Sequence, residues 1–122
     1  METSKYDLSE RLLAYCTKII QLVNKLPRTR AGNHIAGQLL RSGTSALPNH
    51  AEAQAAESPS DFVHKMRISL KELRETQRWL LLVQRVPLIR EPAQVEPLLV
   101  ETDELTRIFV SSIKTAQKNH NL

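Results

Sequence analysis

The apolar residues of the chain recur at helical spacing in four successive stretches. In the first stretch the apolar residues are Leu8, Leu12, Tyr15, Ile19, Leu22 and Leu26. They are four, three, four, three and four positions apart, which is the period of one face of an α-helix. Breaks that contain proline, glycine or serine separate the stretches. The pattern predicts helices over about residues 7–26, 33–56, 59–84 and 92–117.

The second stretch has a helical face but contains two residues that helices disfavour. Gly43 and Pro48 both lower helix stability, and Pro48 lacks the N–H that would bond to the preceding turn. The face nevertheless continues across them, at Ile35, Leu39, Ser42, Ala46, Asn49 and Ala53. We therefore expect a helix that is capped by Asn33 and kinked near Pro48, with Asn49 and Glu52 in or near the core.

The third stretch opens with a strong helix-start signal. Ser58 suits an N-cap, Pro59 suits the first helical position, and Asp61 lies near the positive end of the helix. The expected core face is Phe62, Met66, Leu70, Leu73 and Leu80. A helical wheel places two further groups away from this face: a basic strip of Arg67, Lys71, Arg74, Arg78 and Arg85, and an apolar strip of Ile68, Trp79, Leu82 and Val86.

The fourth stretch follows a connection bracketed by Pro87 and Pro92, and its helix start is left open between Glu91 and Pro97. Its apolar positions are Leu98, Leu105, Ile108, Phe109, Ile113 and Ala116. Four amphipathic helices joined by short connections predict an all-α, antiparallel up-down-up-down four-helix bundle. We expect one domain over residues 1–122.

Composition limits the location and the partners. The net charge of +4 makes a polyanion an eligible partner, although the excess is modest. A single cysteine excludes an internal disulfide and favours a reducing compartment. The N-terminal residues lack the apolar run of a signal peptide, and the longest apolar run, from Trp79 to Val83, is too short to cross a bilayer. We expect a cytoplasmic protein without a membrane partner.

Little in the sequence points to catalysis. Asp61 and His64 have the carboxylate-x-x-His spacing of a di-iron bundle, but such a site needs a second copy and two further carboxylates. His64 falls on the solvent side of its helix, and the four histidines are interpreted as surface residues. No Gly-rich phosphate loop, Cys/His cluster or Ser/His/Asp set stands out. We therefore expect no enzymatic activity, no metal and no cofactor.

Two segments carry a resemblance to a known family. The first is Gln38-Leu-Leu-Arg-Ser-Gly-Thr-Ser45 followed by Pro48-Asn-His-Ala-Glu52, and the second is Ser69-Leu-Lys-Glu-Leu73 with Asp61-Phe62 before it. Over about residues 8–115 the chain resembles the bacterial four helix bundle protein family, also called the 23S rRNA intervening-sequence protein family. It departs from the family pattern at Gly43, His50 and Ala53.

The resemblance implies a fold, an assembly and a loosely defined function. The implied fold is an antiparallel four-helix bundle, and the implied assembly is a homopentameric ring. Some members of the family are encoded inside intervening sequences of 23S rRNA genes. The family is also distantly similar to the accessory protein of diversity-generating retroelements, a basic pentamer that binds a reverse transcriptase and nucleic acid. We therefore expect a homo-oligomer that binds RNA or a protein–RNA complex.

The basic strip is the leading functional candidate. Five positive charges on one helix face are suited to contact phosphates. Because aromatic residues do not interleave the strip, stacking on single-stranded bases is disfavoured. The alternative is a solvated face in which Glu75 pairs with Lys71 and Arg78, in a protein that serves only as a protein–protein scaffold or accessory subunit.

Two other groups are expected to have structural roles. A partly buried polar network between the second and third helices is predicted for Arg41, Asn49, Glu52 and Glu72, because a lone buried carboxylate is costly. The apolar strip is predicted to be an oligomer interface anchored by Trp79, since a monomeric bundle leaves it uncovered. The alternative for Trp79 is a residue that stacks on nucleic acid.

Overall fold

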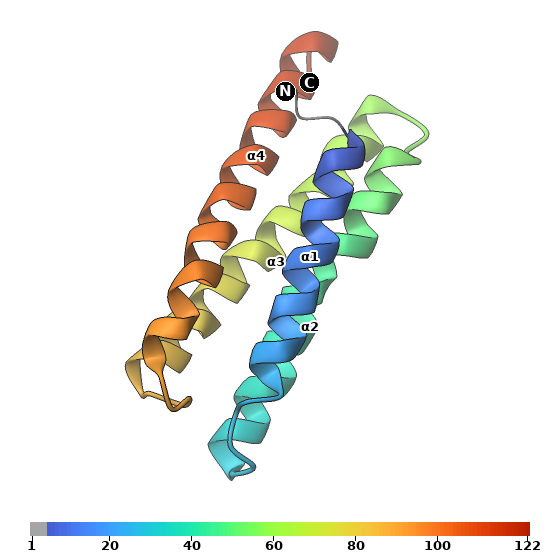
Figure 1. Cartoon of the computed structure of the whole chain (residues 1–122). Coiled ribbons are helices and arrows are strands. Elements are labelled where there is room, and N and C mark those ends of the chain that lie inside the picture. The colour runs from blue at the N-terminus through green and yellow to red at the C-terminus, as the bar shows by residue number, and fades with distance from the viewer. Residues whose placement is uncertain (1–4) are drawn as a thin grey trace.

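The computed structural model describes residues 5–122, with side chains from Asp7 onward. It contains four α-helices and a short 3-10 helix: α1 (Lys5–Val23), α2 (Arg30–Gln54), α3 (Pro59–Arg85), η1 (Pro92–Val95) and α4 (Glu96–His120). The helices run alternately up and down, so the start of α1 and the end of α4 lie at the same end of the bundle (Figure 1). No strand is present in this part of the chain. The predicted all-α four-helix bundle is confirmed.

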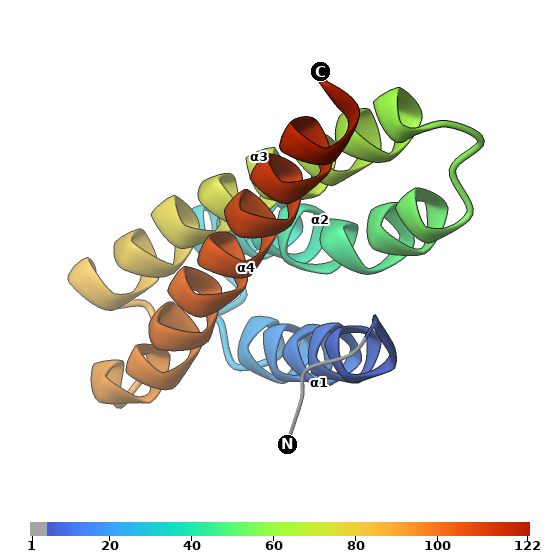
Figure 2. The ribbon, with the colours of Figure 1, turned by 90° about the horizontal axis from the view of Figure 1, so that it is seen from above.

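The helices do not contact one another equally. α2 and α3 share the most extensive contact, α1 packs mainly on α2, and α4 packs mainly on α3. α4 crosses obliquely past α1 (Figure 2), and these two helices touch over only a short length. In this region Arg11 makes a bidentate ion pair with Glu101, at 2.7 and 3.1 Å. The Thr102 hydroxyl donates its single proton to the Leu98 carbonyl oxygen (2.6 Å), so the Tyr15 hydroxyl is the donor in its own 2.6 Å bond to Thr102.

The helix starts follow local capping chemistry. α2 begins three residues earlier than expected, because Thr29 rather than Asn33 is its N-cap and accepts a 3.0 Å hydrogen bond from the Gly32 N–H. The predicted Ser58 cap of α3 is confirmed by its 3.0 Å bond from the Asp61 N–H.

The other boundaries differ from the predicted ones by a few residues. α1 ends at Val23 instead of residue 26, although Leu26 is buried. Because Leu26 continues the apolar spacing of α1, the predicted helix included the turn that follows it. α4 begins at Glu96 after η1, so Pro97 lies in its first turn, where the missing N–H leaves no hydrogen bond unmade.

One face of each helix contributes to the core. The large side chains buried there include Leu12, Tyr15, Ile19, Leu39, Met66, Leu73, Leu80, Val83, Leu105 and Phe109. The prediction for the first turn of α3 is incomplete: Phe62 is half-buried and packs against the core, but the prediction missed Val63, which is 6% exposed and lines a small pocket together with Gln117 of α4. None of the described helices is both long and apolar enough to cross a membrane.

α2 continues unbroken through Pro48, but the polar residue on its buried face is not the expected one. Asn49 is half-buried, and its amide donates to the Ser45 carbonyl oxygen at 2.9 Å within the same helix. His50 is 4% exposed and packs edge-to-face on Phe109, with ring centroids 5.9 Å apart. The interpretation of all four histidines as surface residues is therefore wrong at His50.

Small side chains on α2 let its neighbours approach closely. A Cβ atom at Gly43 would lie 2.7 Å from Cγ2 of Ile19, so α1 packs directly on the Gly43 backbone. On the α3 side, the Thr76 hydroxyl lies 3.0 Å from Ser42 Oγ and 2.8 Å from the Glu72 carbonyl oxygen. These two buried hydroxyls satisfy each other where α2 and α3 meet.

Gly43→Ala is expected to destabilise the fold although alanine is the better helix former. Overpacking against the buried Ile19 costs about 1–3 kcal/mol, which outweighs the gain of about 1 kcal/mol in helix propensity. Chemical denaturation should show a net loss of unfolding free energy. Gly37→Ala is the matched control, because its added methyl group meets nothing within 4 Å, and it should stabilise the fold. If Gly43→Ala remains equally destabilising in an Ile19→Ala background, the close contact is not the cause.

Burial of His50 predicts a loss of stability in acid. Burial lowers the pKa of His50 below its ordinary value, so the unfolded chain binds a proton that the folded chain resists. The stability that depends on neutral His50 should be fully present above about pH 6.5, the pKa of the unfolded group. It should decrease as the pH falls toward the lower pKa of the folded state. In melting experiments His50→Leu should lose less stability between neutral and acidic pH than the wild type. The exposed-site control His64→Gln should behave as the wild type, and an unchanged pH dependence in His50→Leu would contradict this account.

Candidate nucleic-acid interface

The basic strip lies on the outer face of α3, opposite the buried face. All five of its side chains are exposed: Arg67, Lys71, Arg74, Arg78 and Arg85. At 1.5 Å per residue the strip extends about 27 Å along the helix axis. The structure therefore arranges the predicted residues as one continuous line of positive charge.

The strip is not neutralised by the intrahelical pairs that were the alternative interpretation. Glu75 instead accepts hydrogen bonds from Arg41 of α2 and from the Trp79 indole, the latter at 3.0 Å. Within residues 7–122, no side chain of the strip takes part in an ion pair. The positive charges of the strip are therefore available to an external anion.

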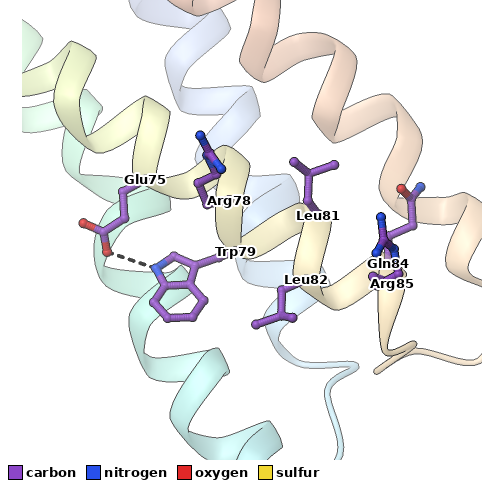
Figure 3. A pocket seen from close by; sticks show the side chains of 7 residues that line it. All are labelled: Glu75, Arg78, Trp79, Leu81, Leu82, Gln84 and Arg85. Atoms are coloured by element: carbon purple, nitrogen blue, oxygen red, sulfur yellow. Dashed lines mark hydrogen bonds between the residues drawn. The ribbon is translucent and has the colours of Figure 1, made fainter.

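An open groove of about 750 Å³ adjoins the C-terminal half of the strip (Figure 3). All the residues that line it come from α3: Glu75, Arg78, Trp79, Leu81, Leu82, Gln84 and Arg85. Two of these, Arg78 and Arg85, also belong to the basic strip. Leu81, which is 45% exposed, was not predicted from the sequence because it falls on neither of the two strips of the wheel.

Trp79 is held in a fixed orientation beside this groove. Its Nε1–H donates to Glu75, and its ring meets the ring of His34 edge-on, with centroids 6.1 Å apart. The indole is half-buried and packs against the core. Trp79 therefore already has partners within its own chain, which its isolated position on the helical wheel did not reveal.

The predicted apolar interface is only partly exposed. Ile68 and Trp79 are half-buried, whereas Leu82 is 39% and Val86 54% exposed. With Leu81, the exposed apolar residues gather at the C-terminal end of α3 rather than along its length. A partner surface centred on these exposed residues is shorter than the apolar strip predicted from the sequence.

The predicted polar network is divided into separate contacts. Arg41 pairs with Glu72 at 3.0 Å and with Glu75. Glu52 is 58% exposed and pairs with Lys65 at 2.9 Å. The amide of Asn49 bonds within α2, as described above. The predicted polar network between α2 and α3 is therefore present only as the Arg41–Glu72 pair, and the prediction is wrong for Asn49 and Glu52, which bond to Ser45 and Lys65 instead.

The remaining reactive side chains do not gather into a site. No group of three or more His, Cys, Asp and Glu side chains among the described residues is placed to hold a metal ion. Burial raises the pKa of the Cys16 thiol to about 11, so this thiol stays protonated at neutral pH. Asp61 lies in the first turn of α3, and His64 is exposed on the same helix.

Comparison with known proteins places the chain in a family. The family model described as 23S rRNA-intervening sequence protein matches residues 4–111. The chain belongs to this family. A crystal structure of a protein of unknown function from the S23 ribosomal protein family of Bacteroides thetaiotaomicron has the same fold, with a TM-score of 0.82. The two sequences are 33% identical, and the match covers 90% of this chain and 97% of that chain. A comparison with curated proteins finds no match.

Proposed function

We propose that this protein is a non-catalytic, cytoplasmic helical-bundle protein that binds RNA, alone or within a protein–RNA complex. The basic strip of α3 is the binding surface. One observation carries the proposal: five exposed cationic side chains lie in a line without an ion-pair partner among the described residues.

An unpaired line of cations favours a polyanion over a single small anion. Each phosphate that a Lys or Arg side chain neutralises releases condensed counterions, and these contributions add along the strand. A strip of about 27 Å spans several phosphates, which gives a favourable free energy without any deep pocket. Four of its five side chains are arginines, whose guanidinium groups bind phosphate oxygens in a bidentate manner.

The acidic residue nearest the centre of the strip does not oppose this binding. Glu75 lies between Lys71 and Arg78 in sequence, and a free carboxylate there would repel phosphates. Its two hydrogen bonds, from Arg41 and Trp79, turn it toward α2, and Arg41, which also pairs with Glu72, offsets part of its charge. The family description, which refers to an intervening sequence of 23S rRNA, favours RNA as the first polyanion to test.

Self-association is a second part of the proposal, and scaffolding without RNA is the competing function. Val86, which is 54% exposed, and the half-buried Ile68 lie outside the α3 groove and support a contact with another protein chain. A homopentamer remains the expectation from the family resemblance. In the competing function the partner is a protein, and the basic strip is a solvent-exposed face that binds no ligand.

Charge neutralisation on the strip tests the RNA-binding proposal. The variant Arg67→Gln, Arg74→Gln, Arg78→Gln should bind a structured ribosomal RNA fragment at least about tenfold more weakly at low salt, because it neutralises fewer phosphates. The slope of log affinity against log salt concentration should become shallower by about one for each cation that no longer pairs with a phosphate. Fluorescence anisotropy of labelled RNA across a salt series measures both quantities.

The matched control removes the same charge elsewhere. Lys18, Arg28 and Arg30 are exposed and have no ion-pair partner among residues 7–122, and none lies on α3. Their triple substitution by Gln should leave the salt slope close to that of the wild type. Equal reductions in affinity in the two triple variants would mean that net charge, not the strip, drives binding. If the wild-type protein does not bind RNA at low salt, the proposal is overturned.

A further inference from the structure

We propose that the α3 groove beside Trp79 receives an unpaired base of the bound RNA, while the phosphates on either side follow the basic strip. This inference rests on the proposed RNA binding and names the kind of RNA: a stem with a loop or bulge, rather than an uninterrupted duplex. The sequence disfavoured base stacking because aromatic residues do not interleave the strip. The structure brings the chain's only tryptophan into a groove that two strip arginines also line.

The indole of Trp79 is prepared for stacking rather than for hydrogen-bond recognition. Its one donor, Nε1–H, is already bonded to Glu75 at 3.0 Å, and Arg41 bonds to the same carboxylate oxygen of Glu75. The His34 ring meets it edge-on and further limits its rotation. A ring that is already held in place loses little conformational entropy when a base stacks on it. Stacking of this kind accepts any of the four bases.

The walls and the rim of the groove match a nucleotide. Leu82 provides apolar surface on the same side of α3 as Trp79, and Leu81 lines the groove from the other side of the helix (Figure 3). Arg78 and Arg85 provide positive charge about 10 Å apart along the helix axis, and both are exposed without ion-pair partners in the described chain. An apolar surface between two free cations is complementary to a base flanked by phosphates.

A continuous duplex cannot use this groove. Its bases are stacked inside the helix, so only its phosphates and 2′-hydroxyls reach a protein surface of this shape. Duplex RNA is therefore expected to use the strip alone. RNA with an unpaired base gains an additional interaction at Trp79, and the groove sets a preference that the strip by itself cannot give.

The fluorescence of Trp79 is a direct probe, because the chain has no other tryptophan. Two probes with equal numbers of phosphates are compared: an RNA hairpin with an unpaired loop and a blunt RNA duplex. The hairpin should quench Trp79 fluorescence and bind about tenfold more tightly, the range expected when one base stacks on an aromatic ring. The duplex should bind without quenching.

Substitution separates stacking from charge. Trp79→Leu should remove the preference for the hairpin and leave duplex affinity unchanged, whereas Trp79→Phe should retain part of the preference. Leu40→Ala is the control, because Leu40 is an exposed apolar residue on α2 that does not line the groove. Thermal melts establish that each variant is folded. If Trp79→Leu does not fold, the wild-type quenching comparison still decides the question.

The contrary outcomes are distinguishable. One contrary outcome is that the hairpin and the duplex bind equally well and neither quenches Trp79, while binding still requires the strip. That result would overturn the base-binding groove and leave the RNA-binding function intact. If neither RNA binds, the proposed function itself is wrong. A Trp79 emission shift that grows with protein concentration in the absence of RNA, together with a larger mass, would show that a second copy covers the groove. That result would also overturn the inference.

Discussion

The structure depends on the close packing that the small side chains of α2 allow on two sides. Ile19 of α1 rests on the bare backbone at Gly43, and the hydroxyls of Ser42 and Thr76 meet where α2 contacts α3. Because this contact and the packing of α4 bury one side of α3, the opposite side must face solvent along its whole length. That outward side carries the basic strip, so the packing of α2 determines where the charge is displayed.

The same proximity of α2 and α3 controls the electrostatics of the surface. Arg41 reaches across from α2 to Glu72 and Glu75, so it satisfies the acidic residues beside the strip with a cation that lies outside it. Glu75 in turn orients the Trp79 indole. The Arg41–Glu75 ion pair therefore leaves the strip unpaired and, through Glu75, fixes the aromatic ring next to it. The exposed pair contributes little to stability by itself, and its main effect is on how α3 presents its charges.

The sequence predicted the fold well because four amphipathic periods and three proline-marked breaks are strong local signals. Errors appeared where a neighbouring helix decides between adjacent positions. His50 rather than Asn49 is buried on α2 because Phe109 packs against the imidazole, and Val63 is buried on α3 and lines a pocket with Gln117 of α4. Neither contact is visible in the sequence of a single helix.

The candidate site was predictable in composition but not in its interactions. The wheel correctly grouped the five basic residues, since one helix presents all of them. It could not show that Glu75 bonds to Arg41, because the two residues lie 34 positions apart. It also could not show that Trp79 packs on its own chain and lines a groove to which Leu81 also contributes. Contacts between helices thus show whether the charges of the strip are paired within the chain or are available to a ligand.

The central claim is that α3 presents its positive charges to RNA, and light scattering coupled to size-exclusion chromatography tests it most directly. The protein is run with and without a structured ribosomal RNA fragment at low and at moderate salt. The account predicts that RNA produces a protein–RNA complex of higher mass at low salt, and that this complex dissociates at moderate salt as the phosphate interactions are screened. A mass that does not change when RNA is added, at either salt concentration, would contradict it. A stable oligomer that behaves in this way would favour the scaffold function.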